Sequence, residues 1–151
     1  MFRGVNVINL DTKWRLAIPA RYRQVLLDRC DGAVVVTIDT DEPCLLIYPL
    51  EEWELIQQKI EALPSFHPMA RRIQRLLIGH AADVELDRNG RILIPSLLRE
   101  YAGLEKRSIL LGQGKKFELW NERCWSERRD QYLKEANESE GVPMELQSIS
   151  L

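Results

Sequence analysis

The chain contains the same element twice, and this duplication limits its fold more than any other feature. Residues 10–23 read LDTKWRLAIPARYR and residues 86–99 read LDRNGRILIPSLLR. The two segments align at an offset of 76 residues, so that residue 10 matches residue 86. The aligned positions share an aspartate, an arginine, an apolar triplet, a proline and a closing arginine. Such agreement along a fixed offset indicates an internal repeat.

A second pair of blocks extends the repeat. LLIYPLEEW at 45–53 matches FELWNERCW at 117–125, which pairs Tyr48 with Trp120 and Trp53 with Trp125. The apolar context of these aromatic residues favours core or subunit-interface packing over base stacking. We therefore divide the chain into four parts: a first half at 5–61, a connecting basic amphipathic helix at 62–80, a second half at 81–132, and a polar C-terminal tail at 133–151.

Within each half the apolar residues change spacing in the same order. Period-two alternation in VNVINLD and RLAIP, and again in ADVELD and RILIP, predicts two short strands joined by the DxxxR stretch as a hairpin turn. Helical spacing follows directly after a proline, which the first turn of a helix tolerates. Two more strands and another helix complete each half. Because a half has too few strands to cover its apolar face, we expect both halves to pack into one barrel-like α+β core with a pseudo-two-fold axis.

The DxxxR turns carry the chemistry that points to a function. The carboxylates of Asp11 and Asp87 can accept backbone N–H groups inside a tight turn. Arg15 and Arg91 can bond that carboxylate, or reach past it to a phosphate or a guanine edge. A single copy would be read as a staple that closes a hairpin. Two copies in register favour an anionic polymer, because further cations flank them: Lys13, Arg21, Arg23, Arg88 and Arg99.

The distribution of charge agrees with an anionic partner although the net charge is −2. Residues 1–23 hold five basic residues and one acid, so the positive charge is concentrated at the start of the chain. The apolar runs are shorter than the roughly 18–20 residues of a membrane span, and we expect a cytoplasmic protein without a membrane partner. The three cysteines show no CxxC spacing, which argues against a zinc site or a disulfide framework.

Catalytic motifs such as HExxH, a nucleophile elbow or a phosphate-binding loop do not occur in the sequence. We therefore expect neither an enzyme nor a cofactor, metal or small-molecule substrate. His67 and His80 suit capping or packing, and the basic run Arg71, Arg72 and Arg75 suits a solvated helix face or pairing with Glu51, Glu52 and Glu54.

The segments MFRG, LDTKWRLAIPARYR, CLLIYPLEEWE, RRIQRLLIGHA, LDRNGRILIPSLLREYAGL and KFELW together resemble the MraZ family of bacterial transcriptional regulators. The resemblance covers the chain to about Trp125. It implies tandem SpoVT/AbrB-like swapped-hairpin halves, which form a β-barrel with peripheral helices and assemble into ring-shaped homo-oligomers. It also implies a nucleoid-associated repressor, which binds direct repeats in the double-stranded promoter DNA of its own division and cell-wall gene cluster.

The resemblance places the DNA contacts on the two turns. The first turn contributes Asp11, Lys13 and Arg15, and the second contributes Asp87 and Arg91, with Arg88 and Asn89 included by position. Two other classes stay open: a ring-forming scaffold in which DxxxR is only a staple, and a hydrolytic enzyme, which the missing motifs disfavour.

Trp14 departs from the family pattern, because the family typically has glycine before the first arginine, as this chain has Gly90 in the second copy. Either the first turn uses another geometry, or it docks on DNA differently. We expect Trp14 to be largely exposed or at a subunit contact, outside the core, because Gly90 adds nothing to the core. There it would either stack on DNA or weaken the first turn.

Overall fold

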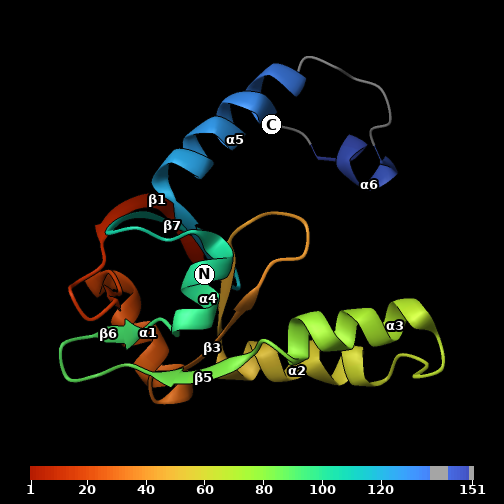
Figure 1. The fold of residues 1–151 in the computed structure, drawn as a ribbon, viewed down its shortest axis with the longest axis horizontal. Coiled ribbons are helices and arrows are strands. Elements are labelled where there is room, and N and C mark those ends of the chain that lie inside the picture. Colours follow the sequence, from red (N-terminus) through yellow and green to blue (C-terminus); the bar gives the residue numbers. More distant parts are fainter. Residues whose placement is uncertain (137–142, 150–151) are drawn as a thin grey trace.

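The computed structural model describes residues 1–136 and 143–149 (Figure 1). Its main sheet is antiparallel, with strand order β1-β7-β8-β4-β3-β5. These strands are β1 (Phe2–Asn9), β3 (Ala33–Ile38), β4 (Leu45–Pro49), β5 (Ala82–Glu85), β7 (Arg107–Gly114) and β8 (Phe117–Asn121). A separate two-stranded ladder pairs β2 (Arg15–Ala17) with β6 (Arg91–Leu93).

The helices follow the repeat. In both halves a helix begins directly after the repeated proline: α1 (Ala20–Cys30) and α4 (Ser96–Ala102). Both end at a left-handed residue, Asp31 at φ 54° and Gly103 at φ 58°. The other helical segments are α2 (Leu50–Glu61), α3 (Pro68–Ile73), the π-helical η1 (Gln74–Ile78), α5 (Glu122–Glu135) and α6 (Met144–Gln147). In the part that the structure describes, none of these helices is both long and apolar enough to cross a membrane.

The two halves are interlocked around a pseudo-two-fold axis. Exchanging each strand for its repeat partner reverses the order of the main sheet and leaves it unchanged. The axis passes through two cross-strand pairs, Leu46 with Glu118 and Leu16 with Ile92. β1 of the first half pairs with β7 of the second, and β5 of the second pairs with β3 of the first. Each half therefore completes the sheet of the other.

The main sheet is open, and the expected closed barrel is wrong in this respect. β1 and β5 are its edge strands, since each is hydrogen-bonded on one side only. The reason is that β2 and β6 are three residues long and pair only with each other, so no strand bridges the two edges. The α+β class and the duplicated arrangement hold.

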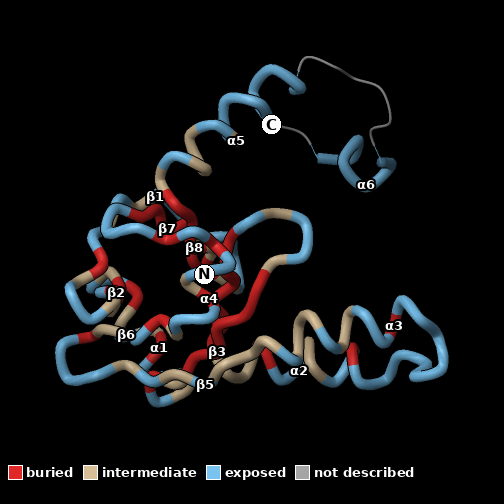
Figure 2. Tube along the Cα trace, in the orientation of Figure 1, coloured by how far each residue is buried: buried red, intermediate tan, exposed pale blue. Residues whose placement is uncertain are grey.

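The main core cluster lies between the sheet, the β2–β6 ladder, α1 and α4 (Figure 2). Two smaller clusters lie under α2 and α5, on the other face of the sheet. Their aromatic pairs obey the repeat: Tyr48 and Trp53 have ring centroids 5.7 Å apart, and Trp120 and Trp125 have centroids 5.5 Å apart. The predicted packing role of these side chains is thereby confirmed. The C-terminal tail lies partly outside the described residues.

Candidate nucleic-acid interface

Both DxxxR stretches fold into the same closed turn. Asp11 Oδ1 accepts the backbone N–H groups of Lys13 and Arg15, each at 2.9 Å. Asp87 Oδ1 accepts those of Asn89 at 2.8 Å and Arg91 at 3.0 Å. An aspartate that bonds the backbone two and four residues ahead closes a turn without help from elsewhere. The predicted role of both aspartates inside their turns is confirmed.

Trp14 adopts the backbone conformation of Gly90, so the expectation of another geometry for the first turn is wrong. Its φ is 61°, against 73° for Gly90, and each residue donates its N–H to the aspartate carbonyl at 3.0 Å. A left-handed tryptophan costs about 1–2 kcal/mol relative to the right-handed region. The first turn therefore adopts the glycine geometry at that cost.

The Trp14 side chain is half-buried, so the expectation that it is largely exposed is wrong, while its place outside the fully buried core residues is confirmed. A position at a subunit contact stays a prediction. Trp14 packs against the main core cluster, and the Arg99 guanidinium lies 4.5 Å from its ring centroid. The physical reason is that α4 of the second half passes beside the first turn and places the Arg99 guanidinium on the Trp14 ring. In this fold the Arg99 guanidinium covers one face of the Trp14 ring. Stacking of Trp14 on DNA stays a prediction.

The ladder holds the two turns side by side. β2 and β6 follow the turns directly, and their antiparallel pairing centres on Leu16 and Ile92. Ile18 donates its N–H to the Gly90 carbonyl at 2.9 Å, and Ile94 donates to the Trp14 carbonyl at 3.1 Å. Each turn is thereby bonded to the strand of the other half. The repeat places the pair of turns on one surface.

The four charged residues of the motifs form one network across the axis. Arg15 Nε lies 2.9 Å from Asp11 Oδ2, and Arg15 Nη1 lies 3.9 Å from Asp87 Oδ2. Arg91 Nη1 lies 3.4 Å from Asp11 Oδ2. The arginine side chains remain 33% and 37% exposed. They brace the turns and still present part of their guanidinium groups to solvent.

Both aspartates are held in the charged form. The backbone N–H of Arg15 lowers the pKa of Asp11 below its ordinary 3.8, and the backbone N–H of Arg91 does the same for Asp87. Burial opposes this shift only in part. The turns therefore keep their hydrogen bonds at neutral pH.

A pH dependence of stability follows from these lowered pKa values. A carboxylate whose pKa is lowered by folding stabilises the folded state at pH values above its ordinary pKa of 3.8. This contribution to the free energy of unfolding disappears as the pH falls through the pKa of the folded state. We expect Asp11→Asn/Asp87→Asn to lower the midpoint of thermal unfolding at neutral pH. The difference from the unchanged protein should close at acid pH. A difference that stays constant down to acid pH would contradict this account.

The tips of the turns carry the unpaired cations. In the described part of the chain, the side chains of Lys13 and Arg88 form no hydrogen bond or ion pair, and both residues are exposed. Asn89 is exposed beside them. With Arg15 and Arg91 this makes four cations, and the acids of the same surface are the two turn aspartates. We call this surface the turn face: Asp11, Lys13, Arg15, Asp87, Arg88, Asn89 and Arg91. Sequence reasoning recognised the repeat and missed the ion pairs across the axis, because they depend on how closely the fold brings the two turns together.

Other candidate residues lie away from the turn face. His67 caps α3 by accepting the Met69 N–H, and His80 bonds the Leu76 carbonyl, as expected for capping or packing. Arg71, Arg72 and Arg75 are exposed, which confirms the solvated helix face. The alternative pairing with Glu51, Glu52 and Glu54 is not formed among the described residues, since Glu51 and Glu52 pair with Arg29 of α1. The fold places α1 beside α2, and this neighbourhood could not be read from the spacing of residues in the sequence.

One group of side chains has the chemistry of metal ligands. Potential ligand atoms of Asp39, Cys44 and Glu118 lie within 4.8 Å of one another. Burial raises the pKa of the Cys44 thiol far above its ordinary value, so the thiol keeps its proton and donates to Asp39. Glu118 accepts the Trp120 indole N–H at 2.8 Å. These hydrogen bonds account for the group without an ion.

The fold and the turn face define a class: a duplicated α+β protein whose repeats interlock and expose two paired basic turns on one surface. The sequence model of the family described as "MraZ protein, putative antitoxin-like" matches residues 1–76 and again residues 77–144. The chain belongs to the MraZ family.

Curated relatives agree along the whole length. A protein of Coxiella burnetii named "Transcriptional regulator MraZ" is 59% identical over 152 aligned residues. Proteins of the same name from Halorhodospira halophila and Legionella pneumophila are 56% and 54% identical. In each case the alignment covers 100% of both chains.

Proposed function

We propose that this protein is a DNA-binding transcriptional regulator that contacts double-stranded promoter DNA through its turn face. The observation that carries the proposal is the pair of DxxxR turns brought together by the β2–β6 ladder, with four cations against two acids. A guanidinium suits bidentate contact with phosphate, and paired basic turns suit the repeated charges of a nucleic acid. The name carried by the relatives supports the same activity.

Within that proposal each turn residue has a distinct task. The aspartates shape the turns, while Arg15 and Arg91 are held by those carboxylates and present their remaining N–H donors. Lys13 and Arg88 meet backbone phosphates as unpaired charges, and Asn89 adds an amide for a base edge. The target we propose is a set of direct repeats upstream of the protein's own division and cell-wall genes, where occupancy represses transcription in the nucleoid.

Footprinting on the DNA upstream of the gene tests this function directly. We expect protected segments that recur at a regular spacing, and protection that the turn variants described in the Discussion remove. Uniform or absent protection on that DNA would contradict sequence-specific regulation.

The salt dependence of binding provides a second measurement. Each phosphate neutralised by the turn face should lower the logarithm of the affinity by about 0.9 per unit of log salt concentration. We therefore expect the logarithm of the affinity for the DNA upstream of the gene to fall steeply and linearly with the logarithm of the salt concentration. Binding titrations at several salt concentrations measure this slope. A flat response would contradict electrostatic binding by this surface.

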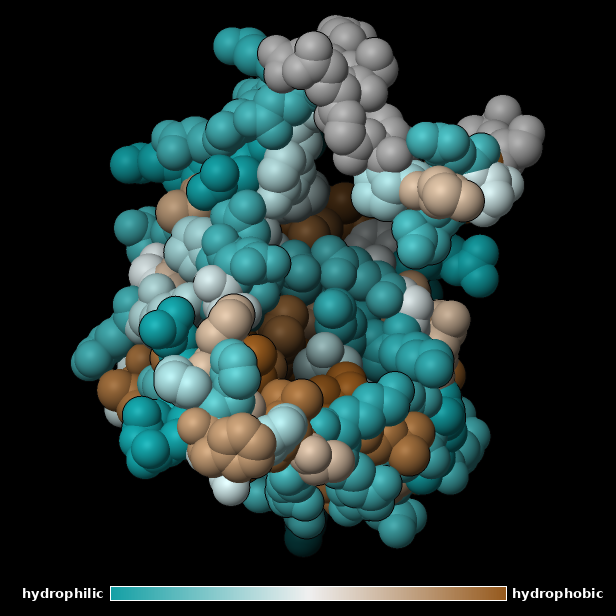
Figure 3. Space-filling model, turned by 90° about the vertical axis from the view of Figure 1, so that its right-hand side faces the viewer, coloured by the Kyte–Doolittle hydropathy of each residue, from teal (hydrophilic) through white to brown (hydrophobic). Residues whose placement is uncertain are grey.

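We also infer the swapped-hairpin architecture and a ring of identical subunits. The strand exchange between halves supports the first inference. For the second, α2 and α3 form a hairpin that projects from the sheet in Figure 1. It exposes apolar side chains between and along its helices, including Phe66 at 87% and Met69 at 59%. Figure 3 shows apolar groups gathered on the lower part of that side.

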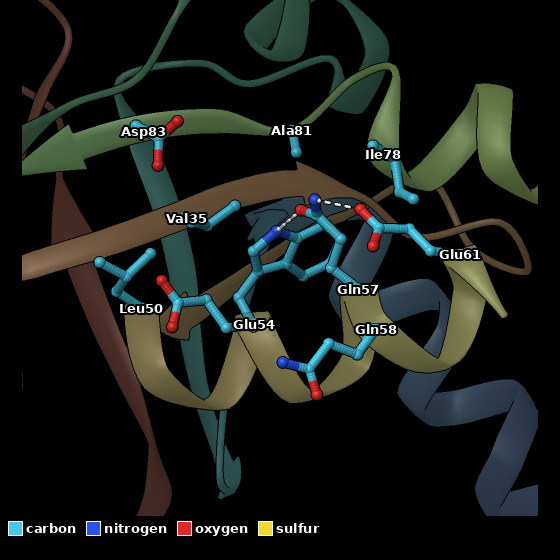
Figure 4. Close-up of a pocket in the computed structure, with 10 residues that line it drawn as sticks. Val35, Leu50, Glu54, Gln57, Gln58, Glu61, Ile78, Ala81 and Asp83 are labelled. Atoms are coloured by element: carbon cyan, nitrogen blue, oxygen red, sulfur yellow. Dashed lines mark hydrogen bonds between the residues drawn. The ribbon is translucent and has the colours of Figure 1, made fainter.

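The charges on this hairpin are complementary. A hollow of about 360 Å³ on one side is lined by Phe66, Pro68, Arg71, Arg72, Arg75 and Leu76. Another of about 490 Å³ carries the carboxylates of Glu54, Glu61 and Asp83 around an apolar floor (Figure 4). A basic surface and an acidic surface on one chain allow a head-to-tail contact between copies, which forms a ring when the rotation closes. The alternative function, a ring scaffold without DNA readout, rests on the same surfaces.

A further inference from the structure

The arginine that closes each repeat lies over the turn of the opposite half, and the two copies behave differently. Arg23 lies over Gly90: a Cβ built on that glycine would be 2.3 Å from Arg23 Nε. Arg23 Nε donates to the Ile18 carbonyl at 2.6 Å. The absence of a side chain at Gly90 therefore lets Arg23 reach a partner inside the protein.

Arg99 is the repeat equivalent of Arg23, and Trp14 is the repeat equivalent of Gly90. The Trp14 side chain fills, beneath Arg99, the space that corresponds to the one Gly90 leaves free beneath Arg23. The Arg99 guanidinium is stacked on the Trp14 ring at 4.5 Å from its centroid. Its Nε is buried and has no hydrogen-bond partner among the described residues. No ion pair of Arg99 with a described carboxylate is formed either. The bond to the Ile94 carbonyl that the repeat would provide is missing.

An unpaired buried guanidinium N–H is costly, and native proteins seldom leave one without a partner. Stacking on an aromatic ring holds the guanidinium plane in one orientation and stabilises its charge. A hollow of about 330 Å³ opens beside the pair and is lined by Trp14, Ser96, Arg99, Glu100, Gly103 and Leu104. Glu100 is exposed and forms no ion pair with Arg99 in the described part of the chain. Arg99 is thus a preoriented cation next to the first turn.

We propose that Arg99, held by Trp14, binds a backbone phosphate of DNA beside the first turn, and that Arg23 makes no such contact beside the second. Trp14 is then a positioning residue: its ring keeps Arg99 away from the Ile94 carbonyl, covers the buried Nε and leaves the terminal Nη groups to contact the phosphate. This inference rests on the proposed function and makes the two turns unequal, with the first contributing an additional phosphate contact.

The test compares the repeat-equivalent arginines on one duplex, the DNA upstream of the gene. Arg99→Ala should lower the affinity about tenfold, the effect of losing one charge-assisted contact, and should reduce the salt slope by about 0.9. Arg23→Ala is the matched control: its stability should fall because the Ile18 carbonyl loses its donor, while the salt slope of the folded variant stays that of the unchanged protein.

Trp14→Gly separates positioning from simple charge. With glycine at position 14, Arg99 can donate to the Ile94 carbonyl as Arg23 donates to the Ile18 carbonyl. We therefore expect the Trp14→Gly variant to show the same affinity and salt slope as Arg99→Ala, although Arg99 is present. Adding Arg99→Ala to Trp14→Gly should cause no further loss, and Trp14→Phe should retain most of the affinity. Circular dichroism verifies that each variant is folded.

A failure of the role proposed for Arg99 can be distinguished from a failure of the proposed DNA-binding function. If the unchanged protein binds the duplex and Arg99→Ala keeps its salt slope, the role of Arg99 is overturned and the turn face stands. A Trp14→Gly variant with unchanged affinity likewise overturns the positioning role. If the unchanged protein does not bind the duplex, the proposed function itself is wrong.

Discussion

Replacing Arg15 and Arg91 together with alanine should abolish binding to the DNA upstream of the gene, with a loss of affinity of at least about 100-fold. Two charge-assisted contacts, each with a net contribution of about 1.5–3 kcal/mol, produce a change of that size. The turn face also loses its excess of positive charge, because two cations then remain against Asp11 and Asp87. Electrophoretic mobility shift and fluorescence anisotropy would measure the effect.

Conservative and remote variants define what this loss means. Arg15→Lys/Arg91→Lys keeps the charge and removes the planar fork, so we expect an intermediate affinity. Arg129→Ala, on exposed α5, removes a cation that pairs with its neighbour Asp130 and should leave binding unchanged. Oligomer size, measured by light scattering, should be the same in all variants. Promoter binding by Arg15→Ala/Arg91→Ala at the level of the unchanged protein would assign the motifs to the staple role and favour the scaffold function.

The largest loss of stability is expected for Phe117→Ala. Phe117 is fully buried and joins the halves: its ring stacks on Phe2 at 4.1 Å between centroids and contacts Tyr22 at 5.3 Å. Truncating a buried phenylalanine costs about 3–5 kcal/mol through lost burial and the cavity that remains. That is a large share of the roughly 5–15 kcal/mol by which domains are stable.

Denaturant unfolding with a matched surface control measures this effect. Leu97→Ala removes an apolar side chain that is 63% exposed, and we expect its free energy of unfolding to change by less than about 0.5 kcal/mol. A loss below about 1 kcal/mol in Phe117→Ala would show that the contact between the halves is not the centre of the core. DNA binding should follow the folded fraction of the variant.

Local chemistry explains why the turns could be predicted. Asp11 and Asp87 act on backbone groups two and four residues away, so their hydrogen bonds are encoded within one short stretch. The helices after Pro19 and Pro95 and the aromatic pairs under α2 and α5 are local in the same sense. A repeat strengthens each such inference because two independent copies must satisfy it.

Contacts between segments far apart in the chain were beyond such reasoning. The partners of Arg29, the half-buried position of Trp14 and the open edges of the sheet all depend on which segments the fold brings together. The tolerance of a left-handed tryptophan is the clearest case, because its cost is local while its packing partner, α4, belongs to the other half. The spacing of residues in the sequence carries no information about how close α4 lies to Trp14.

The sequence by itself determined the duplication and the turn chemistry, because both rest on short-range hydrogen bonding and on apolar period. The residues of the turn face were implied by the family resemblance. The tertiary structure decided that the repeats exchange strands, that Arg15 pairs with both turn aspartates and Arg91 with Asp11 across an axis, and that Arg99 and Arg23 differ. These features depend on three-dimensional packing between residues far apart in the chain: Arg99 lies over Trp14 of the other half, and Arg23 lies over Gly90.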